Sequence, residues 1–150
     1  MLIDGRNVQR ALERGSAAGS LPTSALISRL RAALPDVEVE LVLDGHPGGS
    51  PSGRIAPGFG VSYSRHATAD QVIGDRVAEA LVALGPAGAW SVVVVTDDRE
   101  VQAQARRNGA RVEGTAWLAA RVTGAGRGGT SIGQPRPSRR PRASTEPRLG

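Results

Sequence analysis

An α/β fold, with a doubly wound, mainly parallel sheet of about five strands flanked by helices, is predicted by three features of the 150-residue sequence. Short apolar runs rich in β-branched residues alternate with segments whose apolar residues recur at helical spacing. Most connections between these segments are short, as in chains of β-α units with right-handed crossovers. The run 91–96 (SVVVVT) is almost wholly apolar, which is typical of a central parallel strand covered on both faces.

The first half of the chain contains three of the predicted strands. Residues 1–4 form a short apolar run that ends in Asp4, and residues 37–43 (VEVELVL) form a β-rich run that ends before Asp44. Between them, apolar residues at 26, 27, 30 and 34 predict a helix. The Gly- and Pro-rich residues 45–60 predict a long loop, expected to be a mobile rim, before a short strand over 61–64.

The second half alternates in the same way. Apolar residues at 73, 77, 81 and 84 predict a helix that ends at Gly85-Pro86. After the central strand, residues 101–108 predict a helix with Gly109 just past its end. Residues 111–113 predict a short edge strand and residues 115–122 a final helix.

Residues 124–150 differ from the rest in charge and composition. They contain six arginines and one glutamate, whereas the first 123 residues contain 13 arginines and 13 acids. Having almost no apolar side chains, this segment is predicted to be disordered. It would either attract polyanions non-specifically or serve only as a solubilising end. The sequence therefore predicts an ordered domain over 1–123 and a disordered Arg/Pro/Gly-rich tail over 124–150.

Two residue types are missing, and their absence excludes several functions. Without Cys there is no disulfide framework, thiolate nucleophile or Cys-ligated zinc. Without Lys there is no Walker A phosphate loop and no Schiff-base chemistry. No apolar run approaches the roughly 20 residues of a membrane span, and no signal peptide opens the chain, so the expected compartment is the cytoplasm, with no membrane partner.

Five aspartates fall where predicted strands end or the third helix begins. Asp4 and Asp44 follow the first two strands, Asp97 and Asp98 follow the central strand, and Asp70 stands where the helix begins. Carboxyl ends of parallel strands meet at one edge of a sheet, so we expect these acids to converge. Clustered carboxylates repel one another, and a divalent cation removes that repulsion. Hard oxygen ligands favour Mg²⁺ or Mn²⁺ over zinc, and such an ion can activate water and stabilise a phosphoryl transition state.

Each acid also has a purely structural explanation. Residues 68–71 (TADQ) fit a capping box at the start of a helix. Asp97 fits the cap of the following helix, which would leave Asp98 free to point into the cleft. The Asp-Gly pairs at 4–5 and 44–45 fit turns, so Asp44 is either a metal ligand or a turn residue.

Taken in order, the segments IDGRN, ELVLDG, VSYSRHATADQVI and VVVVTDDREVQAQARRNGARV resemble the NYN domain, specifically its YacP-like branch within the PIN-like nuclease superfamily. The resemblance spans about residues 2–122. It implies a PIN-like, Rossmann-like parallel sheet with an acidic pocket, a divalent metal ion and endoribonuclease activity. It also implies, position by position, three catalytic acids that hold the metal together with a fourth, and a set of supporting residues. These are Asp4, Asp70 and Asp98 as catalytic residues, Asp44 as the further metal ligand, and Asn7 and Thr96 in support. Asp97, as the expected helix cap beside Asp98, is also counted as a supporting residue.

The predicted function is therefore a ribonuclease that hydrolyses RNA phosphodiester bonds at a carboxylate-held Mg²⁺ or Mn²⁺ site, with Arg65 and Arg99 binding phosphates. One departure from the family pattern motivates an alternative. Gln71 stands where relatives often carry a second acid, which removes a charge and questions two-metal occupancy. The alternative is a catalytically weak PIN-like module that binds RNA or protein, and a third hypothesis is a metal enzyme acting on small phosphates. The predicted partner is RNA, bound by the protein alone or within a ribonucleoprotein complex.

Overall fold

In the computed structural model, which describes residues 1–17 and 19–125, six strands form one sheet. Neighbouring strands are parallel except for one antiparallel pair, β3 and β4, at one edge. The mainly parallel α/β sheet is thus confirmed, with one strand more than the expected five or so. The strands lie in the order β3-β4-β2-β1-β5-β6 and comprise β1 (Leu2–Asp4), β2 (Val39–Leu43), β3 (Gly53–Ala56), β4 (Phe59–Tyr63), β5 (Val93–Val95) and β6 (Arg111–Glu113).

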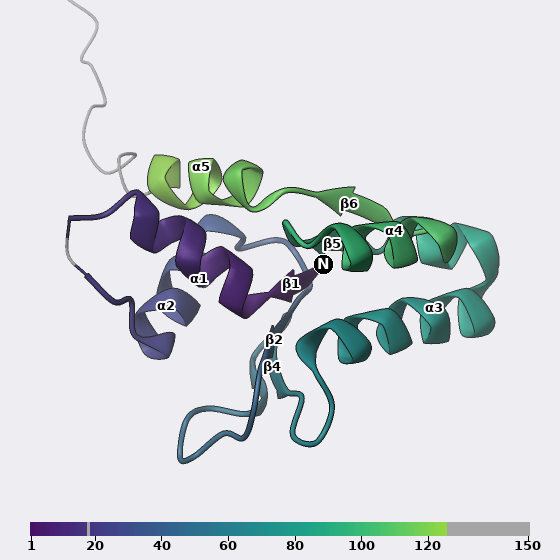
Figure 1. Cartoon of the computed structure of the whole chain (residues 1–150), viewed down its shortest axis with the longest axis horizontal. Helices are drawn as coiled ribbons and strands as arrows, with labels where there is room; N and C mark the ends of the chain where they lie inside the picture. The colour runs from purple at the N-terminus through teal and green to yellow at the C-terminus, as the bar shows by residue number, and fades with distance from the viewer. Residues whose placement is uncertain (18, 126–150) are drawn as a thin grey trace, which may run out of the picture.

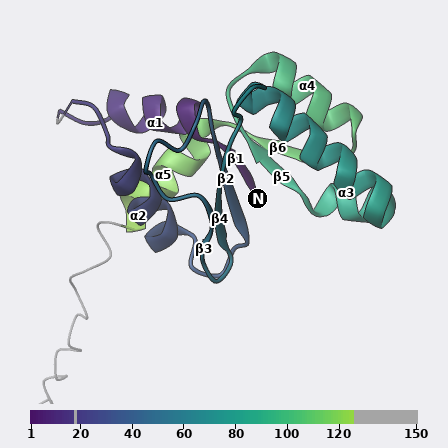
Figure 2. The ribbon, with the colours of Figure 1, turned by 90° about the horizontal axis from the view of Figure 1, so that it is seen from below.

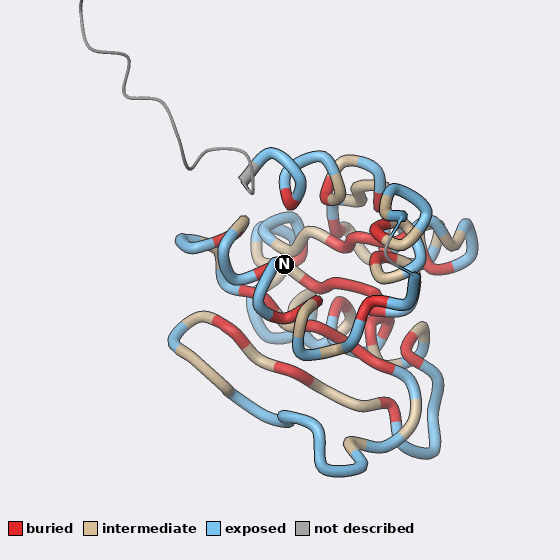
Figure 3. The backbone as a smooth tube through the Cα atoms, turned by 90° about the vertical axis from the view of Figure 1, so that its left-hand side faces the viewer, coloured by how far each residue is buried: buried red, intermediate tan, exposed pale blue. Residues whose placement is uncertain are grey.

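Helices cover both faces of this sheet. On one face lie α1 (Gly5–Arg14), α2 (Thr23–Ala33) and α5 (Thr115–Ala125), and on the other lie α3 (Ala69–Ser91) and α4 (Arg99–Arg107) (Figures 1 and 2). The central strands β1, β2 and β5 therefore send alternate side chains to two separate cores. Ile3 and Leu41 pack under the first group of helices, and Leu2 and Val42 pack under the second. The buried stretches accordingly run through the interior of the molecule, and the loops are largely exposed (Figure 3).

Two helices differ from the prediction. Helix α1 was not predicted, because its ten residues contain only two buried apolar side chains, Val8 and Leu12. Helix α3 does not stop at Gly85-Pro86. Gly85 has φ 68° and ψ −169°, which bends the chain, and helical structure resumes as far as Ser91. The central strand is correspondingly shorter than expected and begins at Val93.

The Gly- and Pro-rich loop predicted over residues 45–60 contains a strand. Its last part forms β3, which turns through Pro57 and Gly58 to pair antiparallel with β4. Gly58 has φ 69°, the conformation that a Pro-Gly turn requires at its second central position. Strand β4 therefore begins at Phe59, two residues before the predicted start.

Gly5, the first residue of α1, packs directly against β2. A Cβ atom at this position would lie 2.9 Å from the backbone oxygen of Val42 and would overlap the Leu43 side chain. The backbone oxygen cannot move without distorting the sheet. We therefore expect Gly5→Ala to lower the free energy of unfolding by about 1–3 kcal/mol, the usual cost of overpacking, in urea titrations.

Gly74 provides the matched control in α3. A Cβ there would meet only the end of the flexible Gln104 side chain, 2.5 Å from Nε2. Alanine is also the better helix former by up to about 1 kcal/mol. Gly74→Ala is thus expected to leave stability unchanged or to raise it, and equal losses for both variants would contradict the close packing of Gly5.

The predicted disordered tail falls almost entirely on residues 126–150, which lie outside the described residues. Helix α5 continues to Ala125, two residues beyond the predicted domain boundary. Within residues 1–17 and 19–125, no helix has the length and apolar composition needed to cross a membrane.

Candidate active site

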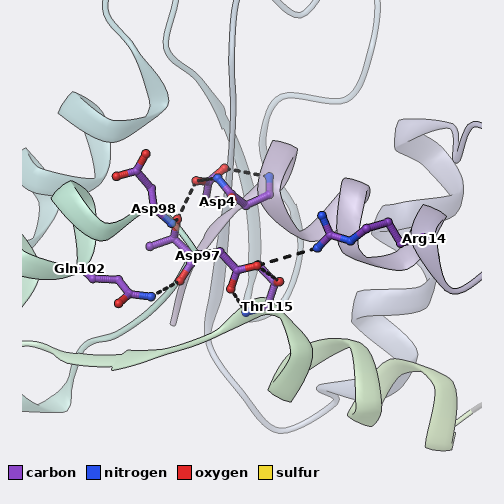
Figure 4. Close-up of polar contacts among 8 residues, drawn as sticks. Asp4, Arg14, Asp97, Asp98, Gln102 and Thr115 are labelled. Atoms are coloured by element: carbon purple, nitrogen blue, oxygen red, sulfur yellow. Dashed lines mark hydrogen bonds and ion pairs between the residues drawn. The ribbon is translucent and has the colours of Figure 1, made fainter.

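Asp4 lies at the carboxyl end of β1, in the middle of the sheet, and is only 2% exposed. Its carboxylate caps α1 by accepting from the Asn7 backbone N–H, with an N···O distance of 3.2 Å. The other oxygen, Oδ2, accepts from Asn7 Nδ2 at 2.5 Å and from the buried Thr96 hydroxyl at 2.9 Å. Three donors thus fix the carboxylate where β1 and β5 end (Figure 4).

Thr96 links Asp4, at the end of β1, to the loop after β5 that carries Asp97 and Asp98. Besides donating to Asp4, its hydroxyl accepts from the Asp98 backbone N–H at 3.1 Å. Its carbonyl oxygen accepts from Gln102 Nε2 at 2.7 Å (Figure 4). Sequence reasoning did not identify Gln102, which lies one helical turn beyond Asp98, on the first turns of α4.

The predicted roles of Asp97 and Asp98 in capping are reversed. Asp98 caps α4, and its Oδ1 accepts from the backbone N–H groups of Glu100 at 2.8 Å and Val101 at 3.2 Å. Asp98 is therefore not free of the helix, although no hydrogen bond within the described residues uses its Oδ2. Asp97 instead accepts from both the backbone N–H, at 2.8 Å, and the hydroxyl of Thr115, the first residue of α5.

This contact explains the reversal. The Asp97 carboxylate is bound to Thr115, and Asp98, whose backbone is extended with φ −69° and ψ 120°, caps α4 in its place. Arg14 of α1 also approaches Asp97, with 3.9 Å between Nη2 and Oδ2 (Figure 4). Asp97 therefore ties the end of β5 to α5 and lies beside α1.

Asp44, which follows β2, contacts the first turn of α3, which carries Asp70. Asp44 Oδ1 accepts from the Ala69 backbone N–H at 3.0 Å, and its Oδ2 lies 3.9 Å from Arg6 Nη1. Asp44 therefore positions the first turn of α3, which carries Asp70. The predicted capping box is confirmed, since Thr68 and Gln71 each accept from the other's backbone N–H. Within the described residues, no hydrogen bond or ion pair uses the Asp70 carboxylate.

The charges around Asp70 agree with the placement of these acids at the carboxyl edge of the sheet. Burial raises the pKa of Asp70 above its ordinary value, and the negative charges of Asp4, Asp98 and Asp44 raise it further, in that order, followed by Glu100. Carboxylates from three strand ends thus act on the one at the start of α3. Neighbouring carboxylates that resist ionisation together are typical of functional sites.

The oxygen atoms of these acids are chemically suitable ligands for a divalent cation. They are carboxylate oxygens, the ligands preferred by Mg²⁺ and Mn²⁺, and they include the unbonded Asp70 carboxylate and Asp98 Oδ2. In the described part of the chain, no three acidic or histidine side chains already stand in the geometry of a metal centre. The residues therefore fit a divalent ion by type and charge. The Asp4 carboxylate already accepts hydrogen bonds from protein donors, whereas no hydrogen bond within the described residues uses the Asp70 carboxylate.

The two arginines predicted to bind phosphates are exposed, and they lie in segments that adjoin the acids of the candidate site. Arg65 is exposed in the loop between β4 and α3, in a left-handed conformation with φ 57°, and its backbone N–H donates to the Gly45 oxygen at 2.8 Å. Arg99 is the exposed first residue of α4, next to Asp98. No ion pair within residues 1–17 and 19–125 involves either guanidinium.

Comparison with known proteins places this chain in a family. The family model of the YacP-like NYN domain matches residues 1–143. The crystal structure of Rae1 (YacP) from Bacillus subtilis, in a mutant form, superposes with a TM-score of 0.60 at 24% sequence identity. The match covers 84% of this chain and 75% of that one, and at this identity it shows the fold alone. No curated protein shows significant similarity to the sequence.

Proposed function

Since the chain belongs to the family of YacP-like NYN domains, within the PIN-like nuclease superfamily, we propose that it is a metal-dependent endoribonuclease that hydrolyses RNA phosphodiester bonds. Members of this superfamily are generally dependent on divalent metal ions. The observation that carries the proposal is the placement of four carboxylates at the carboxyl edge of the sheet, where Asp4, Asp44 and Asp98 stand at or after the ends of β1, β2 and β5 and Asp70 opens α3. Their negative charges also raise the pKa of Asp70. Such a concentration of negative charge repels a phosphodiester unless a cation is present.

The proposed roles follow from the contacts of each acid. Asp4, Asp70 and Asp98 would hold Mg²⁺ or Mn²⁺, which when bound supplies an activated water and stabilises charge on the phosphate. Asp44 would assist through its charge and by holding the first turn of α3. The supporting residues act through these acids: Asn7 and Thr96 fix the Asp4 carboxylate, and Asp97 fixes the loop through α5.

The remaining parts of the proposal concern the substrate and its setting. Arg65 and Arg99 lie on the rim, where exposed guanidinium groups would bind RNA phosphates. We take residues 1–123 as the catalytic domain and the six arginines of residues 124–150 as a source of non-specific attraction to RNA. Action in the cytoplasm, alone or within a ribonucleoprotein complex, belongs to the same proposal.

The test is cleavage of a labelled, mixed-sequence RNA in Mn²⁺, Mg²⁺ or EDTA. Asp98→Asn keeps a cap acceptor but loses the carboxylate, and Asp75→Asn changes an exposed acid of α3 that is not among the four converging carboxylates. We expect cleavage that needs the metal ion, disappears with Asp98→Asn and persists with Asp75→Asn.

Other outcomes would decide between the alternatives. RNA that is bound but intact in every condition would favour the binding module suggested by Gln71, whose amide is occupied in the capping box. Hydrolysis of nucleotides but not of oligonucleotides would favour an enzyme of small phosphates. Either result would overturn the endoribonuclease proposal.

A further inference from the structure

Helix α1 is sharply two-sided. Gly5, Val8 and Leu12 are buried against the sheet and α5, whereas Arg6, Arg10 and Arg14 are all exposed. With 3.6 residues per turn, residues four apart advance by only about 40° around a helix. The three arginines therefore form one stripe, centred opposite the buried face.

This arginine stripe borders the candidate active site at both ends. Arg6 lies 3.9 Å from Asp44, at the end of β2, and Arg14 lies 3.9 Å from Asp97, at the end of β5. The Asp4 carboxylate caps the same helix. A ligand that lies along the stripe would therefore run beside the carboxyl edge of the sheet, where the acids converge.

The stripe remains open to a ligand. The Arg6 and Arg14 side chains are 62% and 70% exposed, and exposed ion pairs of this length contribute little energy. No ion pair within the described residues involves Arg10. The nearby acid of α1 is engaged elsewhere, because Glu13 Oε1 accepts from the Leu21 backbone N–H at 2.8 Å.

The chemistry of the stripe matches a polyphosphate backbone. Guanidinium groups bind phosphate oxygens through two parallel hydrogen bonds, and the protein has 19 arginines and no lysine. Four helical residues rise by about 6 Å, so the Cα atoms of the three arginines are spaced regularly, on the scale of successive phosphates in an extended strand. Single-stranded nucleic acid is bound in such positively charged tracks.

We propose that Arg6, Arg10 and Arg14 bind consecutive phosphates of one RNA strand and lead it past the carboxylates. This inference rests on the proposed ribonuclease function and adds the path of the substrate. It assigns a binding role to the three exposed arginines of α1, which the predicted function did not use.

The salt dependence of binding tests the proposal. Fluorescence anisotropy of a labelled single-stranded RNA, measured with the full chain in EDTA, gives the affinity without cleavage. Each phosphate contact contributes about 0.7 to the slope of log K against log salt for single strands. We expect Arg6→Gln/Arg10→Gln/Arg14→Gln to reduce that slope by about 2 and to weaken binding in 0.1 M salt by at least about tenfold. Arg10→Gln alone, which removes no ion pair within the described residues, is expected to reduce the slope by about 0.7.

The control removes the same charge elsewhere. Arg29→Gln/Arg31→Gln/Arg107→Gln changes three exposed arginines on α2 and at the end of α4. An equal loss of slope in this variant and the stripe variant would show general attraction only and would overturn the proposal, as would no loss in either. Metal-dependent cleavage by the unaltered protein is measured separately. If cleavage occurs and the stripe variant binds normally, only the RNA path is wrong. If the stripe binds RNA and cleavage never occurs, only the enzymatic function is wrong.

Discussion

Replacing Asp4 by asparagine is expected to abolish RNA cleavage and to destabilise the fold. Altering residues that merely support a metal ligand typically costs about 10–100-fold in activity, so losing a ligand itself should cost more than about 100-fold. Asparagine has one acceptor oxygen, whereas the carboxylate now accepts from three donors on Asn7 and Thr96. Its amide group would face one of these donors, at a cost of about 1–3 kcal/mol.

The two effects are separable by experiment. Activity is measured well below the melting temperature of the variant, and a cooperative thermal unfolding transition in EDTA shows that the variant is folded. Asp36→Asn is a suitable control, because Asp36 is exposed and precedes β2, at the opposite end of the strands. Cleavage by the Asp4→Asn variant at the rate of the unaltered protein would contradict a role for Asp4 in the site.

The convergence of the acids follows from features that the sequence displays. Asp4, Asp44 and Asp98 each follow an apolar run, and parallel strands bring their carboxyl ends to one edge. Asp70 could be placed there because it opens the helix after the next strand. The capping box at Thr68 is equally local, since both of its partners lie within four residues. Strand ends and helix caps of this kind can be predicted because they depend on residues that are close together in the sequence.

The features that were mispredicted or left open depend on contacts between distant residues. Asp97 and Asp98 are both acceptable caps, and the choice is made by Thr115 of α5, which binds Asp97. Asp44 holds the N–H of Ala69, 25 residues away, so its role could not be chosen between ligand and turn. No local pattern records either contact.

Two elements were missed because tertiary packing stabilises them. Strand β3 is exposed over Gly53 and Arg54 and shows no alternation of buried residues, and it exists because β4 pairs with it. Helix α1 buries few side chains, and its start is set by the Asp4 cap and by the close packing of Gly5. In both cases intrinsic propensity alone gave too weak a signal.

Replacing Asp70 by asparagine is expected to abolish cleavage as well but to stabilise the metal-free protein at neutral pH. Burial and the charges of Asp4, Asp98 and Asp44 raise the pKa of Asp70 from 3.8, so ionised Asp70 is unfavourable in the folded state. The folded chain therefore binds this proton more tightly than the unfolded chain does. Stability due to this group is fully present below pH 3.8 and is lost as the pH rises through the folded pKa.

Thermal unfolding in EDTA across this pH range checks the sign. The melting temperature of the Asp70→Asn variant should exceed that of the unaltered protein at pH 7, and the difference should shrink as the pH is lowered toward 4, since asparagine does not titrate. A divalent ion should reverse the order. At about 100 times its dissociation constant, an ion stabilises the protein that binds it by about 2.7 kcal/mol, and the variant should lose most of this gain.

The melting temperature in EDTA and the stabilisation by the divalent ion would together assign Asp70 to the metal site more firmly than loss of activity would. A structural aspartate would not be expected both to destabilise the empty protein and to be needed for its stabilisation by Mg²⁺ or Mn²⁺. Equal melting temperatures in EDTA at pH 7, or equal stabilisation of both proteins by the ion, would show that Asp70 does not share a site with Asp4 and Asp98. The repulsion among these carboxylates is then the cost, in stability, of keeping a metal site open in the folded protein.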